Sequence, residues 1–160
     1  MHCSSRTAIL VLTIGIISIL FSAPCFAQTA VKLEAMLNTP ELSWSDAVIF
    51  ILEASEKEVF DDPMEAFRFA ADNKWLPKKA APADNAKLEG IALLLMRSFD
   101  QKGGIFYSLF KNSHYAYREL IQKEVIRGDT DPAMMVSGQE LLLMIGRLLS
   151  IQEQQASNEE

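Results

Sequence analysis

The sequence predicts an all-α protein, built from helix-loop-helix repeats that pack as a small bundle of about five or six helices. Two observations predict this fold class. Segments with apolar residues at helical spacing follow one another along the chain, and several of them begin with a helix-start signal such as Ser137-x-x-Glu140. For the β-branched run "VIFIL" (48–52) a strand is the alternative to a helix, but no other segment favours a strand.

Residues 1–27 have the organisation of a signal peptide. Arg6 precedes an apolar run from Ala8 to Phe21, and small residues end the segment at Ala27. The run is shorter than the roughly 18 apolar residues typical of a spanning helix, so a membrane anchor is the weaker alternative. Pro24 before Cys25 argues against lipid attachment. We expect export to the periplasm or cell envelope, with no membrane span after cleavage.

Cleavage after Ala27 would leave a chain that is long enough for one domain with its own core. Both cysteines, Cys3 and Cys25, leave with the signal, so the mature chain has no disulfide and no thiolate ligand. It keeps all 15 basic residues except Arg6, against 21 acidic ones, and this acidic balance disfavours nucleic acid as a partner. The predicted organisation is a lead-in segment (28–42), a helical domain (43–150) and a polar, frayed tail (151–160).

The first two helices of the domain are predicted from their start signals. "SWSDAVIFILEASE" (43–56) begins with Ser43 and has Asp46 three residues later. "DDPMEAFRFAADN" (61–73) offers Asp62 as a cap, Pro63 in the first turn and Glu65 at the third helical position. We expect a helix in each segment.

The remaining helices follow from the apolar pattern. "AKLEGIALLLMRSF" (86–99) is apolar nearly all round, as expected of a buried helix, and follows the turn-rich stretch 76–85. "IFYSLFKNS" (105–113) predicts a short helix or turn, and "HYAYRELIQKEVI" (114–126) an amphipathic helix. "SGQELLLMIGRLLS" (137–150) predicts a second buried helix.

Two parts of the domain resemble each other. Sliding the chain by 50 places 66–99 on 116–149 without a gap, and matches Phe67 with Tyr117 and Leu93 with Leu143. Each unit (about 64–99 and 114–149) is then an amphipathic helix, a proline-containing loop and a buried helix.

The second unit resembles an S-layer homology (SLH) repeat. Such repeats run through a helix, "G-[IV]-I-x-G", a loop with proline and "[ST]-R-x-E" at the start of a second apolar helix. The matching positions are Ile126, Gly128, Pro132, Ser137 and Glu140. "VFDDPMEAFRFAADNKWL" (59–76) is similar to the entry and first helix of another repeat. The resemblance then implies that residues 43–56 are the closing helix of a partial third unit. The resemblance implies a helical fold and binding to anionic cell-wall polymers, but the arginine of "[ST]-R-x-E" is replaced by Gly138.

The loop "RGDTDPAMMVSGQE" (127–140) has acidic residues at the spacing of a calcium loop. Asp129, Asp131 and Glu140 fall at ligand positions, but Ala133 and Met134 stand where an oxygen ligand and a glycine are needed. We therefore expect Asp129 and Asp131 to accept hydrogen bonds within the loop, and Glu140 to serve the helix start. No metal site is predicted.

A cluster of lysines is the candidate ligand site. Lys74, Lys78, Lys79 and Lys87 lie close together in sequence, beside Trp75, in an otherwise acidic chain. An aromatic face with ammonium groups suits a sugar polymer that carries carboxylate or phosphate. The alternative is an ordinary solvated loop with Trp75 packed into the core.

Catalytic signals are weak. His114 is the single histidine of the mature chain and is expected at the surface or as a cap, Glu89 is expected near a helix start, and no cofactor is predicted. The aromatic stretch "FYSLFKNSHYAY" (106–117) is interpreted as helix-packing surface.

We therefore expect a non-enzymatic, exported binding module of the envelope, attached to an anionic wall polymer or peptidoglycan. The alternative is a structural adaptor that docks a partner protein of the envelope.

Overall fold

The structure is a computed structural model that describes residues 24–128 and 130–157. The chain divides after Met36 into two parts, which are described separately. Helix α2 (Pro24–Leu37) makes up the described portion of the first part. The sequence left a helical turn open in the lead-in segment, and the structure has a longer helix there, whose Ala, Leu, Lys, Glu and Met residues are good helix formers. Most of the predicted signal peptide lies outside the described residues.

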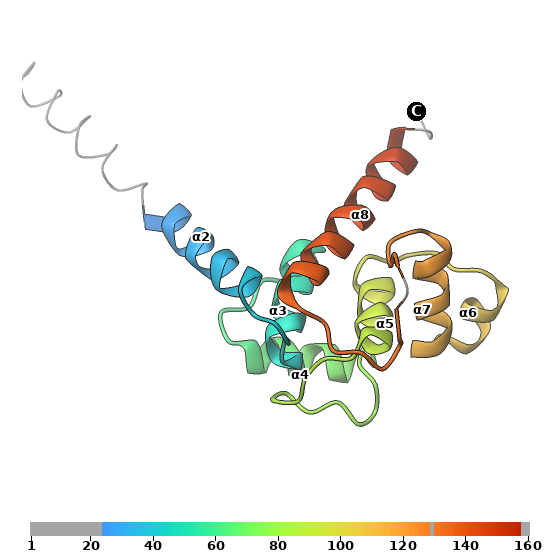
Figure 1. The fold of residues 1–160 in the computed structure, drawn as a ribbon, viewed down its shortest axis with the longest axis horizontal. Helices are drawn as coiled ribbons and strands as arrows, with labels where there is room; N and C mark the ends of the chain where they lie inside the picture. The colour runs from blue at the N-terminus through green and yellow to red at the C-terminus, as the bar shows by residue number, and fades with distance from the viewer. Residues whose placement is uncertain (1–23, 129, 158–160) are drawn as a thin grey trace, which may run out of the picture. The chain divides into compact units, whose positions relative to one another are not determined.

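The second part confirms the predicted all-α class (Figure 1). Its helices in chain order are α3 (Trp44–Ala54), α4 (Pro63–Asp72), α5 (Leu88–Ser98), α6 (Ile105–Phe110), α7 (Ser113–Gln122) and α8 (Gly138–Ser157). With α2, the described residues contain seven helices rather than five or six. "VIFIL" belongs to α3, so the strand alternative is wrong. Within the described residues, no helix combines the length and the apolar character that crossing a membrane requires.

The predicted start signals form the hydrogen bonds expected of them. The Ser43 side chain accepts from the Asp46 amide at 3.2 Å, and the Asp62 carboxylate from the Met64 amide at 3.0 Å. At the start of α8, Ser137 and Glu140 bond each other reciprocally. The Ser137 hydroxyl accepts from the Glu140 amide at 3.2 Å, and the Glu140 carboxylate accepts from the Ser137 amide at 2.9 Å. These bonds satisfy amides that a helix leaves without an internal partner.

The helices recur at fixed spacings in the chain. Helices α4 and α7 begin and end 50 residues apart, α5 begins 50 residues before α8, and α3 and α5 are spaced by 44. The turns that follow α4 and α7 also agree, since Lys74 and Glu124 both have positive φ angles (59° and 56°). The sequence repeat is therefore present in the backbone.

Three segments that precede α3, α5 and α8 form a closed ring of backbone hydrogen bonds. The Leu42 amide donates to the Val136 carbonyl (2.9 Å), the Val136 amide to the Ala86 carbonyl (3.1 Å), and the Ala86 amide to the Leu42 carbonyl (2.8 Å). All three side chains are buried. The ring positions the starts of the three central helices around a pseudo-threefold arrangement.

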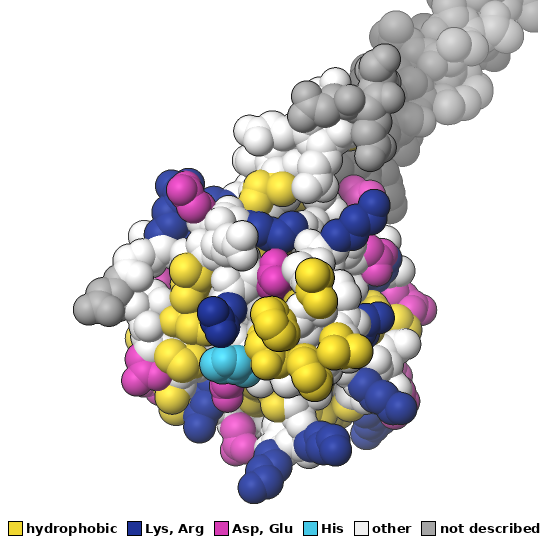
Figure 2. Space-filling view, turned by 90° about the vertical axis from the view of Figure 1, so that its right-hand side faces the viewer, with side chains coloured by type: hydrophobic (Ala, Val, Ile, Leu, Met, Phe, Trp, Pro, Cys, Tyr) yellow, Lys and Arg dark blue, Asp and Glu magenta, His cyan; other side chains and the backbone are white. Residues whose placement is uncertain are grey.

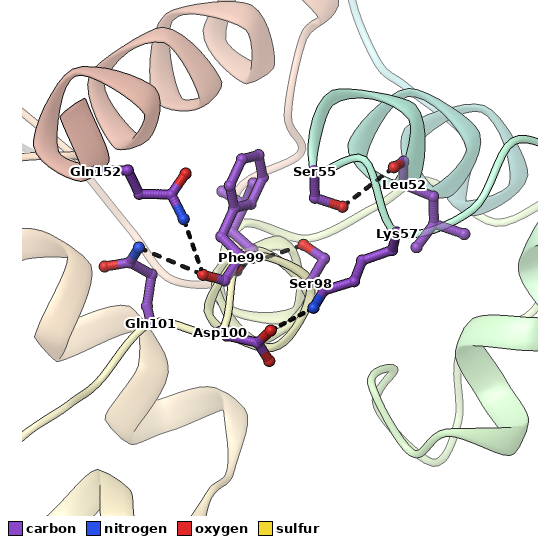
Figure 3. A network of polar contacts seen from close by, with 9 residues as sticks. Leu52, Ser55, Lys57, Ser98, Phe99, Asp100, Gln101 and Gln152 are labelled. Atoms are coloured by element: carbon purple, nitrogen blue, oxygen red, sulfur yellow. Dashed lines mark hydrogen bonds and ion pairs between the residues drawn. The ribbon is translucent and has the colours of Figure 1, made fainter. Parts of the chain in front are cut away.

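The opposite ends of the same helices are joined by side chains (Figure 3). Lys57, which follows α3, forms an ion pair with Asp100, which follows α5. Gln152 of α8 donates to the Phe99 carbonyl at 3.1 Å. Between the two ends lies an apolar core, whose fully buried side chains include Val48, Ile51, Leu52, Ile91, Leu94, Leu95, Met96, Leu120, Leu141 and Leu148.

Helix α8 differs from the sequence prediction in two ways. It continues to Ser157, so the polar tail is helical over its described part, which suits its Gln and Glu residues. Leu143, expected to match Leu93, occupies the equivalent position but is 52 % exposed, whereas Leu93 is 5 % exposed. Helix α7 packs against α5 and α4 against α3, but α8 is the last helix of the described chain and none follows to cover it.

Candidate functional site

The lysine cluster lies on the connection between α4 and α5. Lys74 directly follows the end of α4, Lys78 and Lys79 come after Pro77, and Lys87 is the N-cap residue of α5. All four are exposed. Within the described part of the chain, none of their ammonium groups has a hydrogen-bond or ion-pair partner, so each is available to a ligand.

Trp75 is partly buried rather than free in the loop. Its indole ring meets Phe69 edge-on, with 5.6 Å between ring centroids, and Phe69 in turn lies 5.3 Å from Phe60. Its amide donates to the Ala70 carbonyl at 2.9 Å, which fixes the turn after α4. Packing therefore holds one edge of the indole and leaves part of the ring exposed.

The five predicted site residues do not all lie in the same part of the connection. Lys74, Trp75, Lys78 and Lys79 belong to the first half of the connection. Lys87 pairs with Met135 through its backbone, beside the ring of Leu42, Ala86 and Val136. It thus belongs to the helix junction, and the core of the candidate site is the group formed by the other four residues.

The acidic loop behaves largely as predicted. The Asp131 carboxylate accepts from the Ala133 amide at 2.8 Å, and Glu140 is engaged in the α8 start. Asp129 lies outside the described residues. Among those described, no group of three or more His, Cys, Asp or Glu side chains is arranged to hold a metal ion.

A pocket beside α8 was not predicted. It has a volume of about 120 Å³ and opens to solvent. Its apolar lining is Leu88, Ile126, Met134, Val136, Leu143 and Met144, and its polar lining is Arg127, Thr130, Glu140 and Arg147. Arg147 donates to the Val125 carbonyl at 2.7 Å, and Arg127 pairs with Glu124, so both guanidinium groups are partly engaged.

Comparison of the two units explains the pocket. At the equivalent place in the first unit, the Trp44 ring packs against Gly90 and Pro77. The corresponding residues in the second unit are Leu88, Glu140 and Arg127, all of which line the pocket. A leucine fills less space than an indole, so the site stays open. Aligning Trp44 with Leu88 in the sequence would have pointed to it.

A second unpredicted feature is an exposed apolar surface on α6. Ile105, Phe106, Leu109 and Phe110 are 84 %, 64 %, 72 % and 53 % exposed, and we call these four side chains the α6 surface. Figure 2 shows a continuous hydrophobic area on this side of the molecule, next to a histidine. The interpretation of 106–117 as helix-packing surface agrees with buried Tyr107 and with Phe106 and Phe110, whose rings stack with Tyr115 of α7, but it did not foresee how much of α6 stays exposed. His114 is exposed, as predicted.

The motif positions of the second unit have clear structural roles. Gly128 has a φ of +94°, a conformation that favours glycine, and Pro132 supplies a carbonyl to the Glu89 amide at 3.0 Å. Gly138, in place of the family's arginine, begins α8. Comparison of the chain with known protein families, curated proteins and solved structures finds no match. The resemblance to SLH repeats stays a prediction.

Proposed function

We propose that this protein is an exported, non-enzymatic binding module of the cell envelope, which attaches to an anionic cell-wall polymer or peptidoglycan. The observation that carries the proposal is the set of exposed, unpaired ammonium groups on one connection, next to a partly exposed indole. Between residues 74 and 87 there are four lysines and a single carboxylate, Asp84. In a chain with formal net charge −6, this is a local reversal of sign.

The chemistry of the connection suits such a polymer. Ammonium groups are strongly hydrated point charges that can meet phosphate or carboxylate groups at varied positions along a repeating chain. The indole is held by Phe69 and offers its remaining surface to a sugar ring. Because these charges are exposed, salt screens them over a Debye length of about 8 Å at physiological ionic strength. Binding should therefore be moderate and salt-sensitive.

The test is sedimentation with purified sacculi. The double variant Lys78→Glu and Lys79→Glu should sediment less than the parent, with the same helical circular dichroism. A matched control with equal charge change, Lys102→Glu and Lys111→Glu on another surface, should sediment like the parent. Equal sedimentation of all three proteins would remove the polymer-binding proposal.

Export has its own test. Intact mass of the protein recovered from the envelope fraction should match a chain that begins at Gln28. A mass that retains residues 1–27, or that keeps Cys25 with added lipid, would contradict soluble export.

A second candidate is a structural adaptor that docks a protein partner through α8. The observation that favours it is the open face of this helix, where Leu143 and Leu149 are exposed although their counterparts Leu93 and Phe99 are buried. Because α7 covers α5 in the equivalent unit, the occupant we propose is an amphipathic helix of the partner. Leu143→Arg should abolish capture of one defined protein, while the Lys78 and Lys79 variant should retain it.

A further inference from the structure

The α6 surface has no role in the proposed polymer site, and we propose that it docks the protein on an anionic lipid surface. Soluble proteins rarely expose contiguous apolar areas of this kind without a function. The four side chains project from one short helix that packs on α7, at the margin of the domain (Figures 1 and 2). They protrude from the molecule, whereas the pocket beside α8 is recessed.

The two aromatic side chains of this surface are held in place by α7. The rings of Phe106 and Phe110 stack with Tyr115 of α7, at centroid distances of 5.8 and 5.3 Å. Below them the Tyr107 side chain is buried and ties α6 to the domain. The Gly104 amide donates to the Glu119 carboxylate at 2.8 Å and fixes the start of the helix. Little side-chain order must be gained on docking.

The charged residues in this part of the chain are mostly positive. Residues 101–118 contain Lys102, Lys111, Arg118 and His114 but no Asp or Glu, in a chain with 21 acidic residues. All four are exposed. Of the flanking carboxylates, Asp100 pairs with Lys57, while Glu119 accepts from the Gly104 amide and keeps its negative charge. The apolar side chains of α6 are therefore accompanied by three exposed cations, by His114 and by one carboxylate, so that positive charge predominates.

This combination fits a lipid surface. Apolar and aromatic side chains can enter the boundary between headgroups and acyl chains, while lysine and arginine meet lipid phosphates. A protein partner would require an apolar groove with an acidic rim, and nothing in the chain specifies its shape. The inference uses a different surface from the polymer site and does not depend on the proposed function.

The test needs a local readout, because the apolar run of residues 8–21 can itself bind membranes. In the full chain, Phe106→Trp places an indole in the α6 surface, and Leu143→Trp places one on exposed α8 as a control. Each variant is mixed with vesicles of phosphatidylcholine and phosphatidylglycerol that carry brominated acyl chains. The added emission of the Phe106→Trp protein should shift to the blue and be quenched, and that of the control should not.

The second part of the experiment measures how vesicle binding depends on the charges near α6. Changing Lys102 or Lys111 to Gln in the Phe106→Trp background should weaken partitioning about fivefold each, since one cation near an anionic surface contributes about 1 kcal/mol. The Lys78→Glu and Lys79→Glu pair should leave quenching unchanged. Absence of quenching at position 106 would overturn the proposal and leave a protein partner as the occupant. Equal quenching with phosphatidylcholine alone would overturn the anionic specificity.

Discussion

At the scale of single residues, two tyrosines show that a buried hydroxyl stabilises the fold only when it has a hydrogen-bond partner. Tyr107 is buried and its hydroxyl has no hydrogen-bond partner among the described residues, whereas the Tyr117 hydroxyl contacts the Thr130 carbonyl and hydroxyl at 2.7 and 2.9 Å. An unpaired buried hydroxyl costs free energy, and a paired one contributes about 1 kcal/mol. Tyr107→Phe should therefore be neutral or stabilising, and Tyr117→Phe should lower the free energy of unfolding by about 1 kcal/mol. Urea denaturation of both variants measures this difference.

The Tyr107 hydroxyl also has a predicted pH effect. Burial raises the pKa of Tyr107 above its ordinary value of 10.0, while Arg97 lowers it and Glu119 raises it. The folded state then holds the proton at a pH where the unfolded chain has lost it, so stability declines as pH rises above about 10. This decline should be smaller in Tyr107→Phe than in the parent. Identical pH profiles for the two proteins would contradict this assignment.

Two helical glycines form another matched pair. A Cβ at Gly90 would lie 2.5 Å from Trp44 Cη2 and 2.8 Å from Pro77 Cγ, whereas a Cβ at Gly146 would meet no described atom within 4 Å beyond its chain neighbours and the nearby backbone of its own helix. Gly146→Ala should stabilise the protein by about 0.5–1 kcal/mol, because alanine favours a helix. Gly90→Ala gains the same propensity but must displace the Trp44 ring, at a cost of about 1–3 kcal/mol. Thermal melts should show a rise for Gly146→Ala and no rise for Gly90→Ala.

At the scale of elements, equivalent positions in the two units differ in burial. Leu93→Ala in α5 should lower the free energy of unfolding by about 2–5 kcal/mol, since the side chain is buried. Leu143→Ala should change it by less than about 1 kcal/mol, because half of the side chain already contacts water. Denaturant melts of the two variants test the contrast. Comparable losses would mean that another helix covers α8 in solution.

The same scale shows which elements the sequence could predict. Start signals at Ser43, Asp62 and Ser137 located α3, α4 and α8, because each cap forms bonds within a few residues of its own sequence. Exposure depends on distant neighbours, which is why the sequence did not predict that Phe106 and Phe110 of α6 pack on Tyr115 with one side and remain largely exposed on the other. The pocket depends on the size difference between Trp44 and Leu88 in two repeats. The exposure of the lysines could be predicted, because unpaired charged side chains are rarely buried.

At the scale of the whole molecule, the ring of Leu42, Ala86 and Val136 joins segments that are far apart in sequence. Its three hydrogen bonds cannot open one at a time without uncovering buried side chains, so their amides should exchange with solvent only on global unfolding. The Ser108 and Lys111 amides, which bond within α6 at 2.9 and 2.8 Å, should exchange much earlier because that helix is short and largely exposed. Hydrogen exchange followed by NMR measures both groups.

If the ring is the cooperative centre, its three amides should share one free energy of exchange, and Leu93→Ala should lower all three by the same amount. That value should equal the loss of global stability measured by denaturant. A buried leucine of α5 can affect the Leu42 amide, which precedes α3, only if the three units unfold together. Separate exchange free energies for Leu42, Ala86 and Val136 would mean that the repeats open independently, and the pseudo-threefold arrangement would then be a geometric relation without a common folding unit.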